Sequence, residues 1–141
     1  MLITNHVLSG TVVGLISRSP QAALGWGVLS HFGLDAVPHY GVEDEHFFRL
    51  AVRDGLIGLA AIAAVAAAVP ADRRTRVLAG ITGACLPDMD KVGREFFGRS
   101  PFPEPFDRLH ASIQRESRRH WPVEMAAAVL SLLGSRTLLR R

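Results

Sequence analysis

Three ionisable side chains, spaced four residues apart, interrupt an apolar part of the sequence. The segment 30–41 reads SHFGLDAVPHYG and contains His31, Asp35 and His39. Residues i and i+4 share one face of an α-helix, so His31 and Asp35 are expected side by side. Pro38 is expected to end this helix near residue 36 or 37, which leaves His39 just past the end and close to the same point. Such a group can coordinate a metal ion, or it can form a His–Asp hydrogen bond that closes off a core.

The composition predicts one folded domain over residues 1–141. Apolar residues make up 48% of the chain and charged residues 21%, and the mean hydropathy is +0.20, which excludes a disordered chain. The single cysteine, Cys85, excludes an internal disulfide and a cysteine-based zinc cluster. Any metal must therefore be held by histidines and carboxylates.

Helical periodicity dominates the sequence, and no convincing strand pattern is present. Helices are predicted over 5–16, 20–37, 46–69, 73–85, 104–117 and 122–133, with Thr4 as the cap of the first helix. Residues 91–103 contain several glycines and prolines and are predicted to be an irregular connection. The acidic residues 43–45 are expected in a solvated loop. The prediction is an all-α protein with a single bundle of five to six helices.

An up-and-down bundle of these helices would sort the ionisable residues to its two ends, because each turn reverses the chain. One end would receive arginines: Arg18, Arg73, Arg74, Arg76, Arg136, Arg140 and Arg141. The other end would receive His6, His31, Asp35, His39, Asp54, Asp88, Asp90, His110, His120 and Glu124. A polar His/Asp cluster is therefore expected at one end of the bundle.

For several of these residues the sequence leaves two interpretations open. Asp54 precedes a long apolar run, so it either meets a cation or pairs with Arg49 or Arg53. The stretch LPDMD (86–90) either binds a cation through Asp88 or is an ordinary helix stop.

The histidines are equally open. His6 is either a ligand or a core histidine that is hydrogen-bonded internally. His110 is either a ligand, with Asp107 or Gln114 nearby to orient it, or a surface residue.

Several short motifs resemble bacterial membrane-associated metal-dependent hydrolases of the YdjM type. They are an N-terminal Thr-x-His at 4–6, SHFGLDAVPH, LPDMDK and a late helical histidine. More distantly the sequence is similar to zinc-dependent phospholipase C and P1 nuclease, which are all-α proteins with zinc-binding His/Asp clusters. The resemblance covers about half of the chain. It implies that His6, His31, Asp35, Asp88 and His110 are metal ligands and that Asp54 is a ligand or a base.

Together these features predict a metal-dependent hydrolase of phosphoesters, with lipids among the candidate substrates. Zinc is the expected divalent metal because imidazoles are present, and manganese or iron fit where carboxylates dominate. Asp54 or Glu124 could act as the general base on a metal-bound water. The alternative is a non-catalytic membrane or scaffold protein whose polar cluster binds a metal or is hydrogen-bonded internally. Nucleic acid is not an expected partner, because no recognisable binding motif is present.

The location follows from charge and hydropathy. The longest apolar run, 56–69, has fourteen residues, fewer than the ~18 of an ordinary membrane span, and no signal peptide is recognisable at the start. Arginines gathered at one end fit the positive-inside rule for a cytoplasmic face. We expect association with the bacterial inner membrane, with the arginine end cytoplasmic. A soluble cytoplasmic bundle is the alternative.

Overall fold

The computed structural model describes residues 1–42 and 46–140. Within them it contains seven α-helices, one 3-10 turn and no strand, so the all-α prediction is confirmed with one helix more than expected. The elements are α1 (Ile3–Ile16), α2 (Pro20–Asp35), α3 (His46–Ala68), α4 (Ala71–Cys85), α5 (Met89–Phe97), α6 (Glu104–Ile113), η1 (Arg118–His120) and α7 (Trp121–Leu139). The solvated loop predicted at 43–45 lies outside the described residues.

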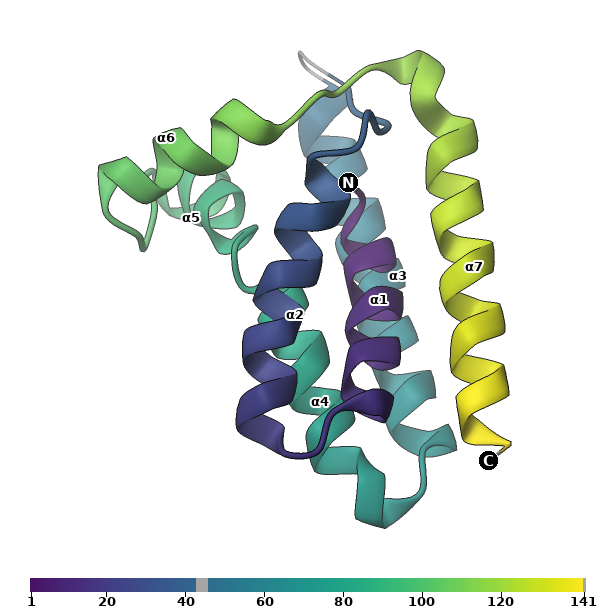
Figure 1. Ribbon diagram of the computed structural model, residues 1–141. Helices are drawn as coiled ribbons and strands as arrows, with labels where there is room; N and C mark the ends of the chain where they lie inside the picture. Colours follow the sequence, from purple (N-terminus) through teal and green to yellow (C-terminus); the bar gives the residue numbers. More distant parts are fainter. Residues whose placement is uncertain (43–45, 141) are drawn as a thin grey trace.

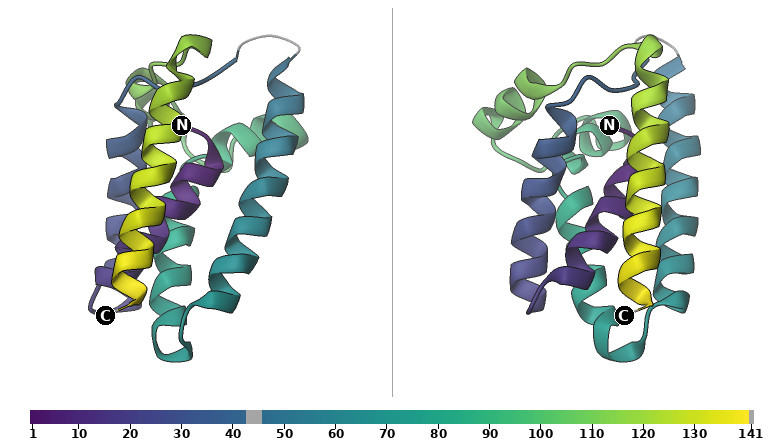
Figure 2. Two further views of the ribbon diagram at one scale, coloured as in Figure 1. Left: turned by 90° about the vertical axis from the view of Figure 1, so that its right-hand side faces the viewer. Right: turned by 45° about the vertical axis from the view of Figure 1, so that its right-hand side comes forward.

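Helix α1 lies at the centre of the bundle and contacts α2, α3, α4 and α7 (Figures 1 and 2). Glycines allow α1 and α4 to pack with their backbones in contact. A Cβ atom on Gly10 would lie only 2.6 Å from the Cα atom of Ile81. The main cluster of buried apolar side chains is small and contains Val7, Leu15, Val69, Val77 and Ile81.

Helices α5 and α6 lie beside the bundle, on the left in Figure 1. The prediction of an irregular segment at 91–103 is wrong, because α5 covers Met89–Phe97. Gly93 does not break the helix but lets it approach the following turn, since a Cβ atom there would lie 2.6 Å from the Arg99 carbonyl oxygen. The helix ends at Gly98, whose φ of 71° is left-handed and suits glycine.

Several helix boundaries also differ from the predictions, and three of them have a clear structural cause. Helix α1 begins at Ile3 with Leu2 as its N-cap, so Thr4 is not the cap but lies in the first turn. Helix α6 ends at Ile113 instead of 117, because residues 115–117 pair with His39 through backbone hydrogen bonds. Helix α7 continues to Leu139, well past the predicted 133, because Leu138 and Leu139 still pack on the core.

The arginine end is present as the sequence predicts, except that Arg141 lies outside the described residues. Arg76 donates to the carbonyl oxygen of Ser17 at 2.9 Å, and Arg73 donates to that of Leu138 at 3.2 Å. The α1–α2 turn, the start of α4 and the end of α7 therefore meet at one end of the bundle.

Among the described residues, two helical segments are long and apolar enough to cross a membrane. They are His46–Ala68, with 23 residues, and Arg118–Leu139, with 22 residues, and only 11% of the most apolar stretch of each is buried. Large apolar side chains on them face outward, including Leu56, Leu59, Leu130 and Leu133. Length and composition are weak evidence for membrane association by themselves.

Candidate metal centre

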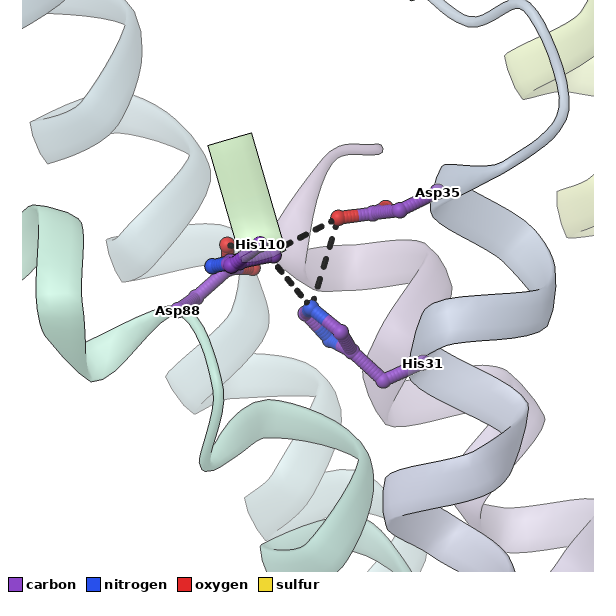
Figure 3. A group of neighbouring side chains, drawn as sticks. All are labelled: His31, Asp35, Asp88 and His110. Atoms are coloured by element: carbon purple, nitrogen blue, oxygen red, sulfur yellow. Dashed lines mark hydrogen bonds and ion pairs between the residues drawn. The ribbon is translucent and has the colours of Figure 1, made fainter. Parts of the chain in front are cut away.

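Two histidines and two aspartates from three parts of the chain meet in one buried cluster (Figure 3). His31 and Asp35 come from the last turns of α2, Asp88 from the turn before α5, and His110 from α6. All four are buried, and one ligand atom of each lies within 4.8 Å of the others. Two imidazoles and two carboxylates form a donor set that can hold a divalent metal ion.

Each of the two histidines is oriented through its Nδ1 atom. His31 Nδ1 lies 2.7 Å from the carbonyl oxygen of Ala84, and His110 Nδ1 lies 2.9 Å from Asp90 Oδ2. When Nδ1 donates in these hydrogen bonds, Nε2 carries a lone pair for a metal. The two Nε2 atoms are 3.0 Å apart, and each lies 3.3 Å from Asp35 Oδ2. The arrangement therefore presents both ligand nitrogens to a single point.

Of the two partners considered for His110 from the sequence, Gln114 contacts it and Asp107 does not. Asp107 binds Arg94 at 2.7 Å and Ser100 at 2.8 Å, and so holds α6 against α5. Gln114 Nε2 contacts the cluster, at 2.9 Å from His110 Nε2 and 3.0 Å from Asp35 Oδ2. His110 is oriented by Asp90, and nothing in the sequence except the LPDMD motif drew attention to this residue.

His6 extends the group on the side of α1. Its ring stacks on that of His31 with centroids 4.0 Å apart, and its Nε2 lies 3.1 Å from Asp35 Oδ1 and 3.7 Å from Asp88 Oδ2. The other oxygen of each aspartate faces His110, at 3.3 Å for Asp35 and 3.9 Å for Asp88. Asp35 and Asp88 therefore each point one oxygen toward His6 and one toward His110.

Several ligand atoms lack hydrogen bonds within the described part of the chain. Both ring nitrogens of His6 and the Oδ1 atom of Asp88 are buried and make none. Most buried polar atoms in proteins are hydrogen-bonded, so atoms like these call for an explanation such as a bound ion. A cation between His6 Nε2 and the two aspartates would give that ring nitrogen a partner.

The cluster also perturbs the protonation of its members. Burial lowers the pKa of His110, but hydrogen bonds to Asp35 and Asp90 outweigh it and raise the value to about 9. Burial raises the pKa of Asp88, but Lys91 and His6 outweigh this effect, so that the carboxyl stays ionised. The amino group of Met1 pairs with Asp35 Oδ1 at 2.6 Å. In the metal-free protein, the proton on His110 and this amine thus lie beside the buried carboxylates.

Asp54 caps helix α1 from the neighbouring helix α3. Its Oδ2 atom accepts a hydrogen bond from the Ile3 amide at 2.5 Å, and its Oδ1 atom accepts one from the Thr4 hydroxyl at 2.6 Å. Among the described residues it forms no ion pair with Arg49 or Arg53, which are both exposed. Asp54 can lie beside an apolar run because its carboxylate accepts hydrogen bonds from unpaired groups at the start of helix α1. The role of Asp54 as a ligand or a base stays a prediction.

Glu124 and His39 lie outside the group of four. Glu124 accepts hydrogen bonds from the amides of Leu2 at 3.3 Å and Tyr40 at 3.2 Å, and from the side chain of Asn5. His39 is buried, with Nδ1 2.8 Å from the Val37 carbonyl oxygen and Nε2 3.5 Å from Glu116 Oε1. Their predicted roles as base and ligand have no direct support in this geometry.

Comparison of the chain with family models, with curated proteins and with solved structures found no match. The resemblance to the YdjM-type hydrolases thus rests on the short motifs alone. The function has to be inferred from the chemistry of the site.

Proposed function

We propose that the protein is a metal-dependent hydrolase of phosphoesters. The observation that carries the proposal is the convergence of His31, Asp35, Asp88 and His110, with ligand atoms within 4.8 Å of one another in a buried place. Burying ionised carboxylates is costly, and a divalent cation offsets that cost. Zinc suits the imidazole ligands best, and manganese or iron are the alternatives.

The residues around the centre would each contribute to hydrolysis. A bound divalent ion lowers the pKa of a water molecule and polarises a phosphoryl oxygen. Asp90 and the Ala84 carbonyl hold the two histidines in the ligating orientation. Of the two candidate bases, Asp54 is better placed, because it lines the same cavity as Asp88 whereas Glu124 does not.

We further propose that the bundle is embedded in the bacterial inner membrane. Helix α3, with 23 residues, is about 35 Å long at 1.5 Å per residue, enough for the ~30 Å hydrocarbon core. Close glycine-mediated packing between α1 and α4 is common among membrane helices. The arginine end would face the cytoplasm and the metal centre the opposite side or its interface. A soluble bundle remains the competing hypothesis.

A scaffold protein is the second candidate function, and one observation favours it. Much of the cluster is already hydrogen-bonded internally, since His31 contacts Ala84, His110 contacts Asp90, and Gln114 donates to Asp35. A scaffold would keep these contacts, remain stable in EDTA and hydrolyse nothing.

Hydrolysis by the purified protein distinguishes the two functions. The protein is stripped with EDTA, reloaded with zinc, manganese or iron, and tested on p-nitrophenyl phosphate, bis-p-nitrophenyl phosphate and phospholipid vesicles. We expect turnover only with metal, lost in Asp88→Asn and retained in the control Arg99→Gln, whose side chain is exposed and lies outside the cluster. A metal-loaded protein that cleaves none of these substrates would exclude phosphoester hydrolysis.

A further inference from the structure

A small cavity lies next to the metal centre, between the start of α3 and the turn that carries Asp88. Its volume is about 100 Å³, which is room for a group the size of phosphate. Asp88 lines the cavity and also belongs to the metal-ligand group. A molecule in the cavity would therefore lie beside a metal ion held by that group.

Lys91 brings a positive charge into this cavity. It is the only lysine in a chain with fifteen arginines, and its partly buried side chain lies in the wall. Its Nζ atom is 3.3 Å from Glu116 Oε1 and 3.4 Å from Asp88 Oδ1. Asp88 Oδ1 is in turn 3.9 Å from His110 Nε2. The Asp88 carboxylate thus lies between the Lys91 ammonium and His110 of the metal centre.

The ammonium has donor capacity beyond these two partners. A lysine ammonium carries three N–H groups, and in the described residues Nζ has only the two carboxylates as acceptors. An ion bound by Asp88 would also compensate the charge of that carboxylate and weaken its attraction for Lys91. Lys91 can then donate to an anionic ligand.

The Glu116 side of the cavity is built from two paired segments. The amide of His39 donates to the Arg115 carbonyl at 3.1 Å, and the amide of Ser117 donates to the His39 carbonyl at 3.0 Å. The backbone at Gly41 leaves space for Glu116, because a Cβ atom on this glycine would lie 2.5 Å from the Glu116 Cβ. These contacts fix Glu116, and Glu116 in turn holds Lys91 in place.

We propose that Lys91 binds the phosphoryl group of the substrate, with one phosphoryl oxygen on its ammonium and another at the metal centre. This inference rests on the proposed hydrolase function.

The rest of the lining selects the substrate class. Leu2, Ile3, Phe47 and Leu50 make part of the wall apolar. Asp54 and Glu116 would repel a second anionic group. The substrate class is an ester of a single phosphate with an apolar substituent, and not a polyphosphate.

The test measures anion binding, independently of turnover. Metal-loaded protein in detergent is titrated calorimetrically with inorganic phosphate, butyl phosphate, glycerol phosphate and pyrophosphate, and the bound metal is counted in every sample. The variants are Lys91→Met, which removes the charge, and Lys91→Arg, which keeps it. Arg99→Met is the control, because it removes a positive charge just after the same helix at an exposed side chain that does not line the cavity.

We expect Lys91→Met to raise the dissociation constant of phosphate at least tenfold when samples with the same number of bound metal ions are compared. Lys91→Arg should stay within about threefold of the wild type, and Arg99→Met should not differ from it. Butyl phosphate should bind more tightly than glycerol phosphate, which has a similar size but a polar substituent, and more tightly than pyrophosphate.

Two results would overturn the inference. The first is a phosphate affinity in Lys91→Met that equals that of the wild type once both are corrected for the metal they contain, whether or not the variant binds less metal. The second is equal or tighter binding of glycerol phosphate or pyrophosphate, which would reject the apolar monophosphate class. Wild-type protein that binds no metal would instead reject the proposed function.

Discussion

Replacing Asp54 with asparagine should destabilise the protein because it removes the charged cap of α1. Asp54 accepts hydrogen bonds from the Ile3 amide and from the Thr4 hydroxyl and amide, and its side chain is only 8% exposed. Asparagine keeps one oxygen for Thr4 but lacks the second acceptor needed by Ile3. A hydrogen bond to a charged group contributes about 1.5–3 kcal/mol, so we expect a loss of about 2 kcal/mol.

Thermal unfolding in detergent, followed by circular dichroism, measures this effect. At about 2–4 °C per kcal/mol, Asp54→Asn should lower the midpoint by about 4–8 °C. Asp54→Ala should lower it further, since both amides lose their acceptor. The control is Asp72→Asn in the first turn of α4, where the aspartate is exposed and its effect should stay below about 1 kcal/mol.

The opposite pattern would refute the capping role. If Asp54→Asn unfolds at the wild-type temperature but loses metal or turnover by a factor of a hundred, Asp54 acts as a ligand or a base.

Three other predictions concern the metal centre and the location of the protein. Asp35→Asn should abolish stoichiometric metal binding with little change in helicity, because the side chains are nearly isosteric; unchanged affinity in a metal titration would show that Asp35 is not a ligand. Metal uptake at pH 7.5 should release a proton from His110, whose pKa is about 9 in the metal-free protein. The apparent metal affinity should therefore rise with pH up to about 9, as measured by calorimetry in buffers of different ionisation enthalpy, and a pH-independent affinity would contradict this. The protein should stay with membranes after high-salt and carbonate washes, and recovery as a monodisperse soluble protein without detergent would exclude membrane embedding.

The parts of the site that lie close together in the sequence could be predicted from it. His31 and Asp35 share a face because their spacing matches the helical repeat, and the helix itself starts at Pro20 as expected. The arginine end also followed from the sequence, since it depends only on the alternating direction of consecutive helices. Local spacing and chain direction therefore carried much of the prediction.

The contacts between distant residues could not be predicted in the same way. Asp54 caps a helix that begins 51 residues earlier, and nothing in its local sequence names that partner. Helix α5 was missed because Gly93 breaks a helix by propensity, whereas here it permits close packing against residues 99–101. Asp90 could orient His110 only once α5 and α6 were placed side by side. Lys91 had one signal that could have been used, namely that it is the only lysine.

Metal analysis of the protein purified without chelator tests the central claim most directly. The four converging side chains predict at least one divalent ion per chain by elemental analysis, lost in His31→Ala and retained in the control Arg99→Gln. Removal of the ion by EDTA should also lower the midpoint of thermal unfolding, because the ion stabilises only the folded state. A wild-type protein that contains no divalent ion, takes none up from zinc, manganese or iron solutions and unfolds at the same temperature in EDTA would contradict the metal centre.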